Sequence, residues 1–115
     1  MRVHEMRLRD EPFDSILKGE KTVELRLLDE KRRAIKAGDR IVFSRMDNSD
    51  DKFEVEVTKL TTAPSFVELF KTIDPSAGGW PVGTTAEQAT EDMDKYYSRE
   101  EQARYGVVGI EIQKI

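Results

Sequence analysis

Residues 17–26 constrain the fold most, because they place the end of a helix directly before the start of a strand. The spacing of Phe13, Ile16 and Leu17 predicts a short helix. Gly19 follows it, and glycine readily takes the left-handed conformation that ends helices. Apolar and polar side chains then alternate with the period of a strand. The apolar face of this predicted strand consists of Val23, Leu25 and Leu27.

The other face of the same strand is polar and carries Thr22, Glu24 and Arg26. Glu24 and Arg26 are two positions apart, which separates them by about 7 Å along the strand. Lys21 precedes the strand, where its long side chain can reach either face. We expect these groups to form the floor of a polar pocket. The alternative is a row of surface charges that keeps the strand soluble.

Length and composition indicate one domain that spans residues 1–115. Hydrophobic and charged residues each make up 37% of the chain, so the core must be small and the surface strongly ionic. The absence of cysteine excludes disulfides and thiolate metal sites. No apolar run reaches the length of a membrane helix, and the N-terminus lacks the apolar core of a signal peptide. We therefore expect a cytoplasmic protein with no membrane partner.

The net charge of −4 argues against a general polyanion binder, but the charge is unevenly distributed. Residues 1–45 carry 12 Lys and Arg against 9 Asp and Glu, a net charge of +3. Residues 46–115 carry 7 against 14, a net charge of −7. This asymmetry fits a local basic cleft on an acidic body, and it fits equally well a solvated surface without a partner.

Several further strands and turns can be predicted along the chain. Strands are expected at 1–8, 40–45, 53–57 and 107–115, with a hairpin loop at 48–51. On the first strand, Val3, Met6 and Leu8 are the expected apolar side chains. Pro12 suits the first turn of the helix that follows. Residues 29–36 are consistent with one helical turn or a loop.

Three later helices are predicted from their N-terminal residues. Ser65, Thr84 and Ser98 are each followed three positions later by glutamate, the pattern of a capping box. Residues 74–83 are too rich in glycine and proline for regular structure. About five or six strands with helices between the later ones predict an α+β fold, a small and partly open β-barrel with flanking helices.

The polar strand resembles the signature of the ASCH family, which reads Gly-x-Lys-x-x-Glu-x-Arg. Gly19, Lys21, Glu24 and Arg26 match it position by position. Residues 96–101 and 105–112 resemble the closing helix and strand of small bacterial members, so the resemblance covers essentially the whole chain. It implies a single ASCH domain with a PUA-like barrel and helices beside a cleft.

Binding of RNA or of a nucleoside is our first hypothesis for this cleft. Glu24 would accept a hydrogen bond from an exocyclic amine of a base, while Lys21 and Arg26 would offset phosphate charge. Ser44, Trp80 and Tyr97 are expected at the border, and Thr22 is the hydroxyl nearest to the floor. Trp80 either plugs the mouth of the barrel or offers a stacking plane to a base.

The neighbouring tyrosines Tyr96 and Tyr97 differ by about 100° on a helix, so we expect one in the core and one near the cleft. A basic set on other segments could steer a phosphate backbone or be solvated only. It consists of Arg32, Arg33, Lys36, Arg40 and Arg45.

A hydrolase on the same cleft is the alternative, with Lys21 and Glu24 as catalytic candidates. Some family members resemble N4-acetylcytidine amidohydrolases, in which the implied nucleophile is a threonine three positions after the lysine. Glu24 occupies that position here. Other members resemble metal-assisted ribonucleases, for which a divalent metal would be needed. Otherwise we expect no metal or cofactor: the acidic residues show no ligand spacing, and the single histidine, His4, is more consistent with a structural role.

A third hypothesis is a protein-interaction domain that uses the acidic C-terminal half as its contact surface. Its protein partner is unknown.

Overall fold

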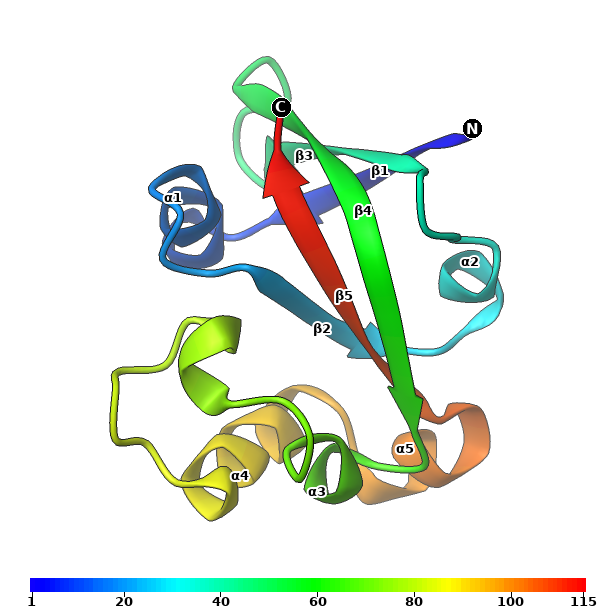
Figure 1. Cartoon of the computed structure of the whole chain (residues 1–115), viewed down its shortest axis with the longest axis vertical. Helices are drawn as coiled ribbons and strands as arrows, with labels where there is room; N and C mark the ends of the chain where they lie inside the picture. The colour runs from blue at the N-terminus through cyan, green and yellow to red at the C-terminus, as the bar shows by residue number, and fades with distance from the viewer.

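The computed structural model describes residues 1–115 and contains five strands in one curled sheet (Figure 1). The strands are β1 (Val3–Leu8), β2 (Val23–Leu27), β3 (Arg40–Arg45), β4 (Lys52–Ala63) and β5 (Val107–Lys114). Their order is β1-β3-β4-β5-β2, and only β1 and β3 run parallel. The predicted α+β class and partly open barrel are confirmed, with five strands.

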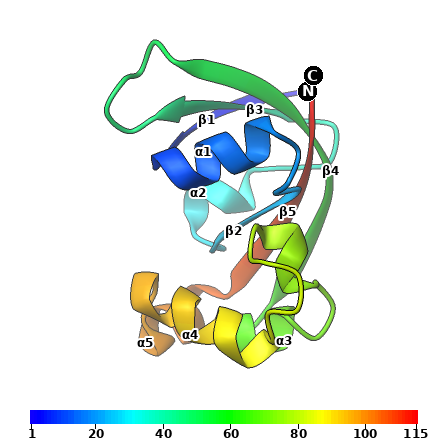
Figure 2. The same cartoon turned by 90° about the vertical axis from the view of Figure 1, so that its left-hand side faces the viewer.

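The helices gather at the two ends of the curled sheet (Figure 2). They are α1 (Asp10–Leu17), α2 (Glu30–Arg33), α3 (Phe66–Leu69), α4 (Ala86–Tyr96) and α5 (Arg99–Tyr105), with the 3-10 turn η1 (Pro75–Gly78) between α3 and α4. Helix α1 lies inside the curl formed by β1, β3 and β4, whereas α3, α4 and α5 cover the opposite end.

Two hydrophobic cores follow from this arrangement. The first joins α1 to β1, β3, β4 and β5 and is centred on Phe13 and Phe43. The second joins α3 and α4 to β2, and the apolar face predicted for β2 packs into it. Each fully buried side chain of this kind contributes roughly 1.5–3 kcal/mol. Strand β2 is therefore anchored from its apolar face, which leaves its polar face to form a site.

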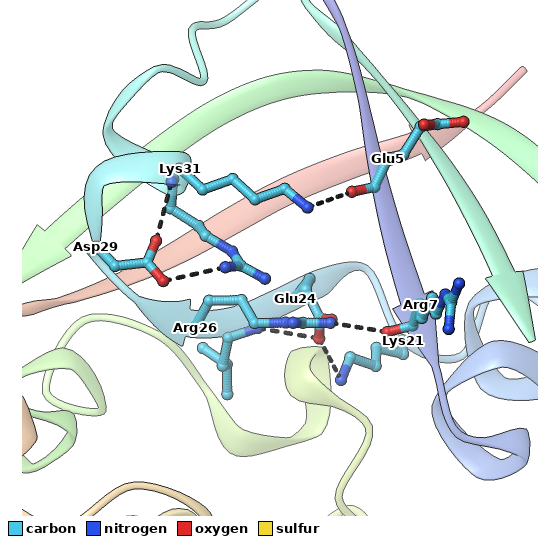
Figure 3. Close-up of polar contacts among 9 residues, drawn as sticks. Glu5, Arg7, Lys21, Glu24, Arg26, Asp29 and Lys31 are labelled. Atoms are coloured by element: carbon cyan, nitrogen blue, oxygen red, sulfur yellow. Dashed lines mark hydrogen bonds and ion pairs between the residues drawn. The ribbon is translucent and has the colours of Figure 1, made fainter. Parts of the chain in front are cut away.

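Strands β1 and β2 are the two edges of the sheet and do not pair with each other. Side chains bridge the seam between them (Figure 3). Arg26 on β2 donates from Nη2 to the carbonyl of Arg7 on β1 at 3.2 Å. Lys31 on α2 donates to the carbonyl of Glu5 at 2.8 Å. These bonds satisfy two edge carbonyls that a closed barrel would pair with backbone amides.

The junction between α1 and β2 is built as predicted. The helix ends at Leu17, and Gly19 has a φ of +81°, a conformation that other residues rarely adopt. Pro12 lies in the first turn of the helix, where its missing N–H costs nothing. The chain therefore turns sharply after α1 and enters β2 with Lys21 beside the helix end.

Strand β1 differs from the expectation at its first residues. Val3 is 54% exposed, while His4, Met6 and Leu8 point inward. His4 can occupy an interior position because its Nε2 lies 2.9 Å from the buried Asp39 carboxylate. The carboxyl of Asp39 accepts from His4 and from the backbone amides of Arg2 and Lys36, and these hydrogen bonds hold its pKa well below the usual range.

Strand β4 is longer than the predicted 53–57. It runs for 12 residues because β5 pairs with it through a register shift between Val57 and Lys59. Residues 29–36 form one helical turn, α2, and Asp29 caps it by accepting from the amide of Arg32.

The predicted helix starts are correct at two positions and shifted by one residue at the third. Ser98 and Glu101 form a full capping box at α5. Ser65 accepts from the amide of Glu68, but the Glu68 carboxylate pairs with Lys71 instead of returning to the cap. The cap of α4 is Thr85 rather than Thr84, because Gln88 completes the reciprocal pair.

Residues 74–83 are not wholly irregular as predicted. Asp74 accepts from the amide of Ser76 and so caps the η1 turn, whose first residue is Pro75. This turn lies against the start of β2, since the amide of Thr22 donates to the carbonyl of Ala77 at 2.9 Å.

Candidate functional site

A cleft of about 1000 Å³ lies between the β1–α1 junction on one side and the η1 turn with α4 on the other. It is lined by side chains from segments that are far apart in the sequence. These segments are 7–12, 21–26, 78–81 and 92–97, with single contributions from Ser15 and Met46. Strand β2 supplies the floor, because its polar face is the one that the second core leaves uncovered.

Glu24 is the centre of this floor and is only 3% exposed. Its Oε1 accepts from Lys21 Nζ at 2.9 Å and from the amide of Leu25 at 3.2 Å. Its Oε2 accepts from Nε of Arg26 at 3.1 Å, and Nη2 of Arg26 forms an ion pair with the same oxygen at 3.1 Å. Figure 3 shows Lys21 and Arg26 converging on this carboxylate. Both oxygens of the Glu24 carboxylate are therefore engaged by groups of the protein itself.

Two opposing effects act on the carboxyl of Glu24. Burial raises its pKa, while the charges of Lys21 and Arg26 and their hydrogen bonds lower it more, so the net pKa lies below the ordinary value. Glu24 is therefore ionised at neutral pH. It orients two cations, which contact one oxygen each.

Trp80 forms an aromatic wall next to the floor. Its indole N–H donates to Asp92 on α4 at 2.8 Å, and its ring meets Phe70 edge to face at 5.5 Å. The same hydrogen bond lowers the pKa of Asp92. Gly78 lies directly under the ring, since a Cβ there would come within 2.8 Å of Trp80 Cζ3. Trp80 thus packs on the second core and also lines the cleft.

Tyr96 and Tyr97 both line the cleft, which differs from the expectation that only one would. Tyr96 is the last residue of α4, and the guanidinium of Arg9 lies 4.8 Å from the centre of its ring. Tyr97 stacks on Phe66, and burial raises the pKa of its hydroxyl. The helical angle between them does not apply, because Tyr97 has an extended backbone with φ of −132°.

The other two predicted site residues, Ser44 and Thr22, do not line the cleft. Phe43 points into the first core, so its neighbour Ser44 lies on the opposite side of β3. Thr22 precedes β2 and is exposed, with its backbone held by η1. Ser15, at the inner side of α1, is a hydroxyl that does line the cleft.

A profile of the ASCH domain matches residues 6–115 of the chain. The chain belongs to the ASCH domain family. Among solved structures, hypothetical protein PH0355 is 35% identical, with a TM-score of 0.85 over 100% of both chains. Protein PF0455 from Pyrococcus furiosus is 32% identical, with a TM-score of 0.70 over 98% of this chain and 97% of that one.

More distant ASCH structures show the same fold. The ASCH domain from Lactobacillus crispatus JV V101 is 16% identical, with a TM-score of 0.65 over 98% of this chain and 79% of that one. Together with the curled sheet, this similarity shows an ASCH fold of the PUA-like kind. No curated protein matches the chain.

Most of the basic residues considered for steering a phosphate backbone form ion pairs and do not line the cleft of this ASCH domain. Arg45 binds three carboxylates, Arg40 pairs with Glu54, and Arg32 pairs with Asp29. The cleft is lined instead by Arg7 and Arg9, which the sequence reasoning missed. Arg7 and Arg9 are two residues apart at the end of β1, so the alternation of a strand places both on the same face. This spacing could have predicted them as neighbours in the cleft.

No group of three or more His, Cys, Asp or Glu side chains is arranged to hold a metal ion. His4 has Asp39 as its partner and lies in the sheet, outside the residues that line the cleft. None of the helices is long and apolar enough to cross a membrane.

Proposed function

We propose that the cleft of this ASCH domain binds RNA through a single unpaired nucleotide, or binds a free nucleoside. One observation carries the proposal: two cations, fixed by a buried carboxylate, share a cleft with a rigid indole. Single-stranded nucleic acids are commonly bound by cations that follow the backbone and aromatic rings that stack on bases. The expected cytoplasmic location belongs to the same proposal.

The aromatic side of the cleft supports stacking of a base. Trp80 is held from two directions, by Asp92 and by Phe70, so little side-chain entropy would be lost on binding. Stacking on an aromatic ring contributes about 1–3 kcal/mol per base. Tyr96, 56% exposed at the mouth of the cleft, offers a second ring beside Arg9.

Binding is favoured over hydrolysis by the state of Glu24. A general base works best with a pKa near the working pH, and the pKa of Glu24 is lowered. Its two oxygens are already engaged by Lys21, Arg26 and the amide of Leu25, and Thr22 does not line the cleft. Lys21 and Glu24 therefore act in this proposal as binding and positioning groups. Amidohydrolase and ribonuclease activity remain the alternatives that the experiment must test.

An NMR titration of ¹⁵N-labelled protein tests this proposal. The probes are cytidine, N4-acetylcytidine and a short single-stranded RNA, with amide shifts and product peaks followed in one sample. We expect shifts confined to residues 19–26 and 78–81. They should be lost in Lys21→Ala and retained in Lys71→Ala, which removes an exposed lysine outside the cleft.

Each outcome has a definite meaning. A product peak would convert the binding module into an enzyme. The absence of shifts with all three probes up to about 1 mM, roughly 4 kcal/mol of binding, would contradict the proposal. The acidic residues 46–115 would then be the place to look for a protein partner.

A further inference from the structure

The floor of the cleft has hydrogen-bond donors left over, because Lys21 and Arg26 carry more N–H groups than the protein uses. Lys21 uses one of its three N–H groups on Glu24. Arg26 uses Nε and Nη2 on Glu24 and on the carbonyl of Arg7, whereas Nη1 makes no hydrogen bond within the protein. A ligand at this floor must therefore bring acceptors. The expectation that Glu24 accepts from a base amine is disfavoured, because Glu24 is 3% exposed and both its oxygens already contact Lys21 or Arg26.

The same floor also carries an uncompensated positive charge. Two cations share one carboxylate, which gives the group a net charge of +1. The side chains of Lys21 and Arg26 are only 12% and 18% exposed, so water screens this charge poorly. A singly charged anion balances it, whereas a neutral base edge leaves it uncompensated.

We infer that Lys21 and Arg26 bind a phosphodiester oxygen of the nucleotide, so that the ligand is a phosphate-linked RNA unit and not a free nucleoside. A phosphodiester carries one negative charge and offers only acceptors. It therefore matches both the unused N–H donors and the net positive charge of Lys21, Glu24 and Arg26. This inference rests on the proposed function and narrows its substrate class.

The position of the aromatic wall fits a phosphate and a base of one nucleotide. Gly78 contacts the ring of Trp80, and a Cβ on the next residue, Gly79, would lie 3.4 Å from Cδ of Lys21. The indole and the lysine side chain thus pack on two consecutive glycines. A nucleotide whose phosphate meets Lys21 can place its base along Trp80.

Calorimetric titration with three probes tests the inference: the RNA dinucleotide CpA, its neutral methylphosphonate analogue and cytidine. The analogue retains the shape and loses the charge. We expect CpA to bind at least 10-fold more tightly than the analogue. Lys21→Gln retains a hydrogen-bond donor and removes the charge, so the ratio of the binding constants of CpA and its analogue should fall below about 2-fold. Lys71→Gln, outside the cleft, should leave this ratio unchanged. Amide spectra of both variants verify that they are folded.

Salt dependence gives an independent readout. The logarithm of the CpA binding constant should fall with the logarithm of salt concentration with a slope of about −0.7, the value for one phosphate of a single strand, and the analogue should show a slope near zero.

The possible failures are distinguishable. Equal binding of CpA and its methylphosphonate analogue would overturn the phosphate assignment and leave nucleotide binding intact. Inorganic phosphate that binds as tightly as CpA would overturn the assignment to a nucleotide. If none of the three nucleoside-containing probes binds, the proposed function itself fails.

Discussion

Two charge clusters in this domain have opposite compositions. In the first, which we call the Arg45 cluster, one guanidinium binds the carboxylates of Asp10, Asp14 and Asp51 at 3.0, 2.7 and 2.6 Å. In the second, the Glu24 cluster, one carboxylate binds the cations of Lys21 and Arg26. The first has an excess of carboxylates and the second an excess of cations.

The Arg45 cluster joins α1 to the hairpin between β3 and β4. Each of the three guanidinium nitrogens donates to a different carboxylate, and these hydrogen bonds raise the pKa of Arg45 above its ordinary range. The guanidinium also lies 4.1 Å from the centre of the Phe13 ring, at the edge of the first core. The surplus carboxylates are well exposed, so water satisfies them, including Asp10 at the border of the cleft.

The Glu24 cluster differs in the location of its unused hydrogen-bonding groups. Its spare donors belong to side chains that are mostly buried and face the cleft. The number of charges therefore does not distinguish a structural charge cluster from one that binds a ligand. The separating property is whether the unsatisfied groups face solvent or a cleft that a ligand can enter.

The largest expected effect comes from removing the centre of the Glu24 cluster. Glu24→Gln leaves two cations close together with little solvent, so we expect a loss of about 3 kcal/mol in the free energy of unfolding. Urea denaturation measures it. Glu54→Gln breaks an exposed pair with Arg40 and should cost less than about 0.5 kcal/mol. Equal effects of the two substitutions would remove the distinction between the buried Glu24 cluster and an exposed ion pair.

The pH dependence of that loss sharpens the comparison. The folded pKa of Glu24 lies below its ordinary value of 4.5, so its stabilisation is fully present above pH 4.5 and disappears as the pH falls through the folded pKa. The difference in stability between wild type and Glu24→Gln should therefore be constant from pH 7 to about pH 5 and shrink only in stronger acid. A difference that already closes above pH 6 would mean that burial outweighs the two cations.

A smaller effect is expected at the aromatic wall. Gly78→Ala inserts a Cβ under the Trp80 ring and should destabilise the fold by about 1–3 kcal/mol while weakening nucleotide binding. Trp80→Phe shortens the ring system that the Cβ approaches most closely and leaves only the looser contact with Leu25, so Gly78→Ala should be less destabilising in the Trp80→Phe variant. Denaturation of the two single variants and the double variant measures this coupling. Additive effects would show that Gly78 does not fix the indole.

The smallest effect is expected from the Arg45 cluster. Arg45→Met retains packing on Phe13 and removes the charge, which should cost less stability than Gly78→Ala because the released carboxylates are already hydrated. Nucleotide affinity should change much less than in Lys21→Gln, because only Asp10 of the released carboxylates borders the cleft. A loss of affinity comparable to that of Lys21→Gln would show that binding depends on general charge and not on the Glu24 cluster.

The sequence was sufficient for features that depend on local chemistry. Alternation with a period of two assigned the faces of β2 correctly, and Gly19 marked the turn before it. Caps at Ser65 and Ser98 were predictable because a hydroxyl three residues before a carboxylate satisfies helix amides without help from the rest of the fold.

Features that depend on distant segments could not be predicted. Glu24 is buried although it lies on the polar face of β2, because Lys21 and Arg26 contact its carboxylate at the floor of the cleft, and this makes Glu24 an internal anchor. The bond from Arg26 to the carbonyl of Arg7 requires the curl that brings the two edge strands together. Ser44 was placed at the cleft without knowledge of which face of β3 meets the core.

The most direct measurement is the side-chain ¹⁵N–¹H spectrum of lysine and arginine during a titration with CpA. We expect the Lys21 ammonium and Arg26 guanidinium signals to shift with the binding isotherm, while the Arg45 Nε signal, from a guanidinium bonded to carboxylates, should not shift. Binding of CpA with no change at Lys21 and Arg26, or with an equal change at Arg45, would contradict the claim that the buried cation excess of the Glu24 cluster is the binding site.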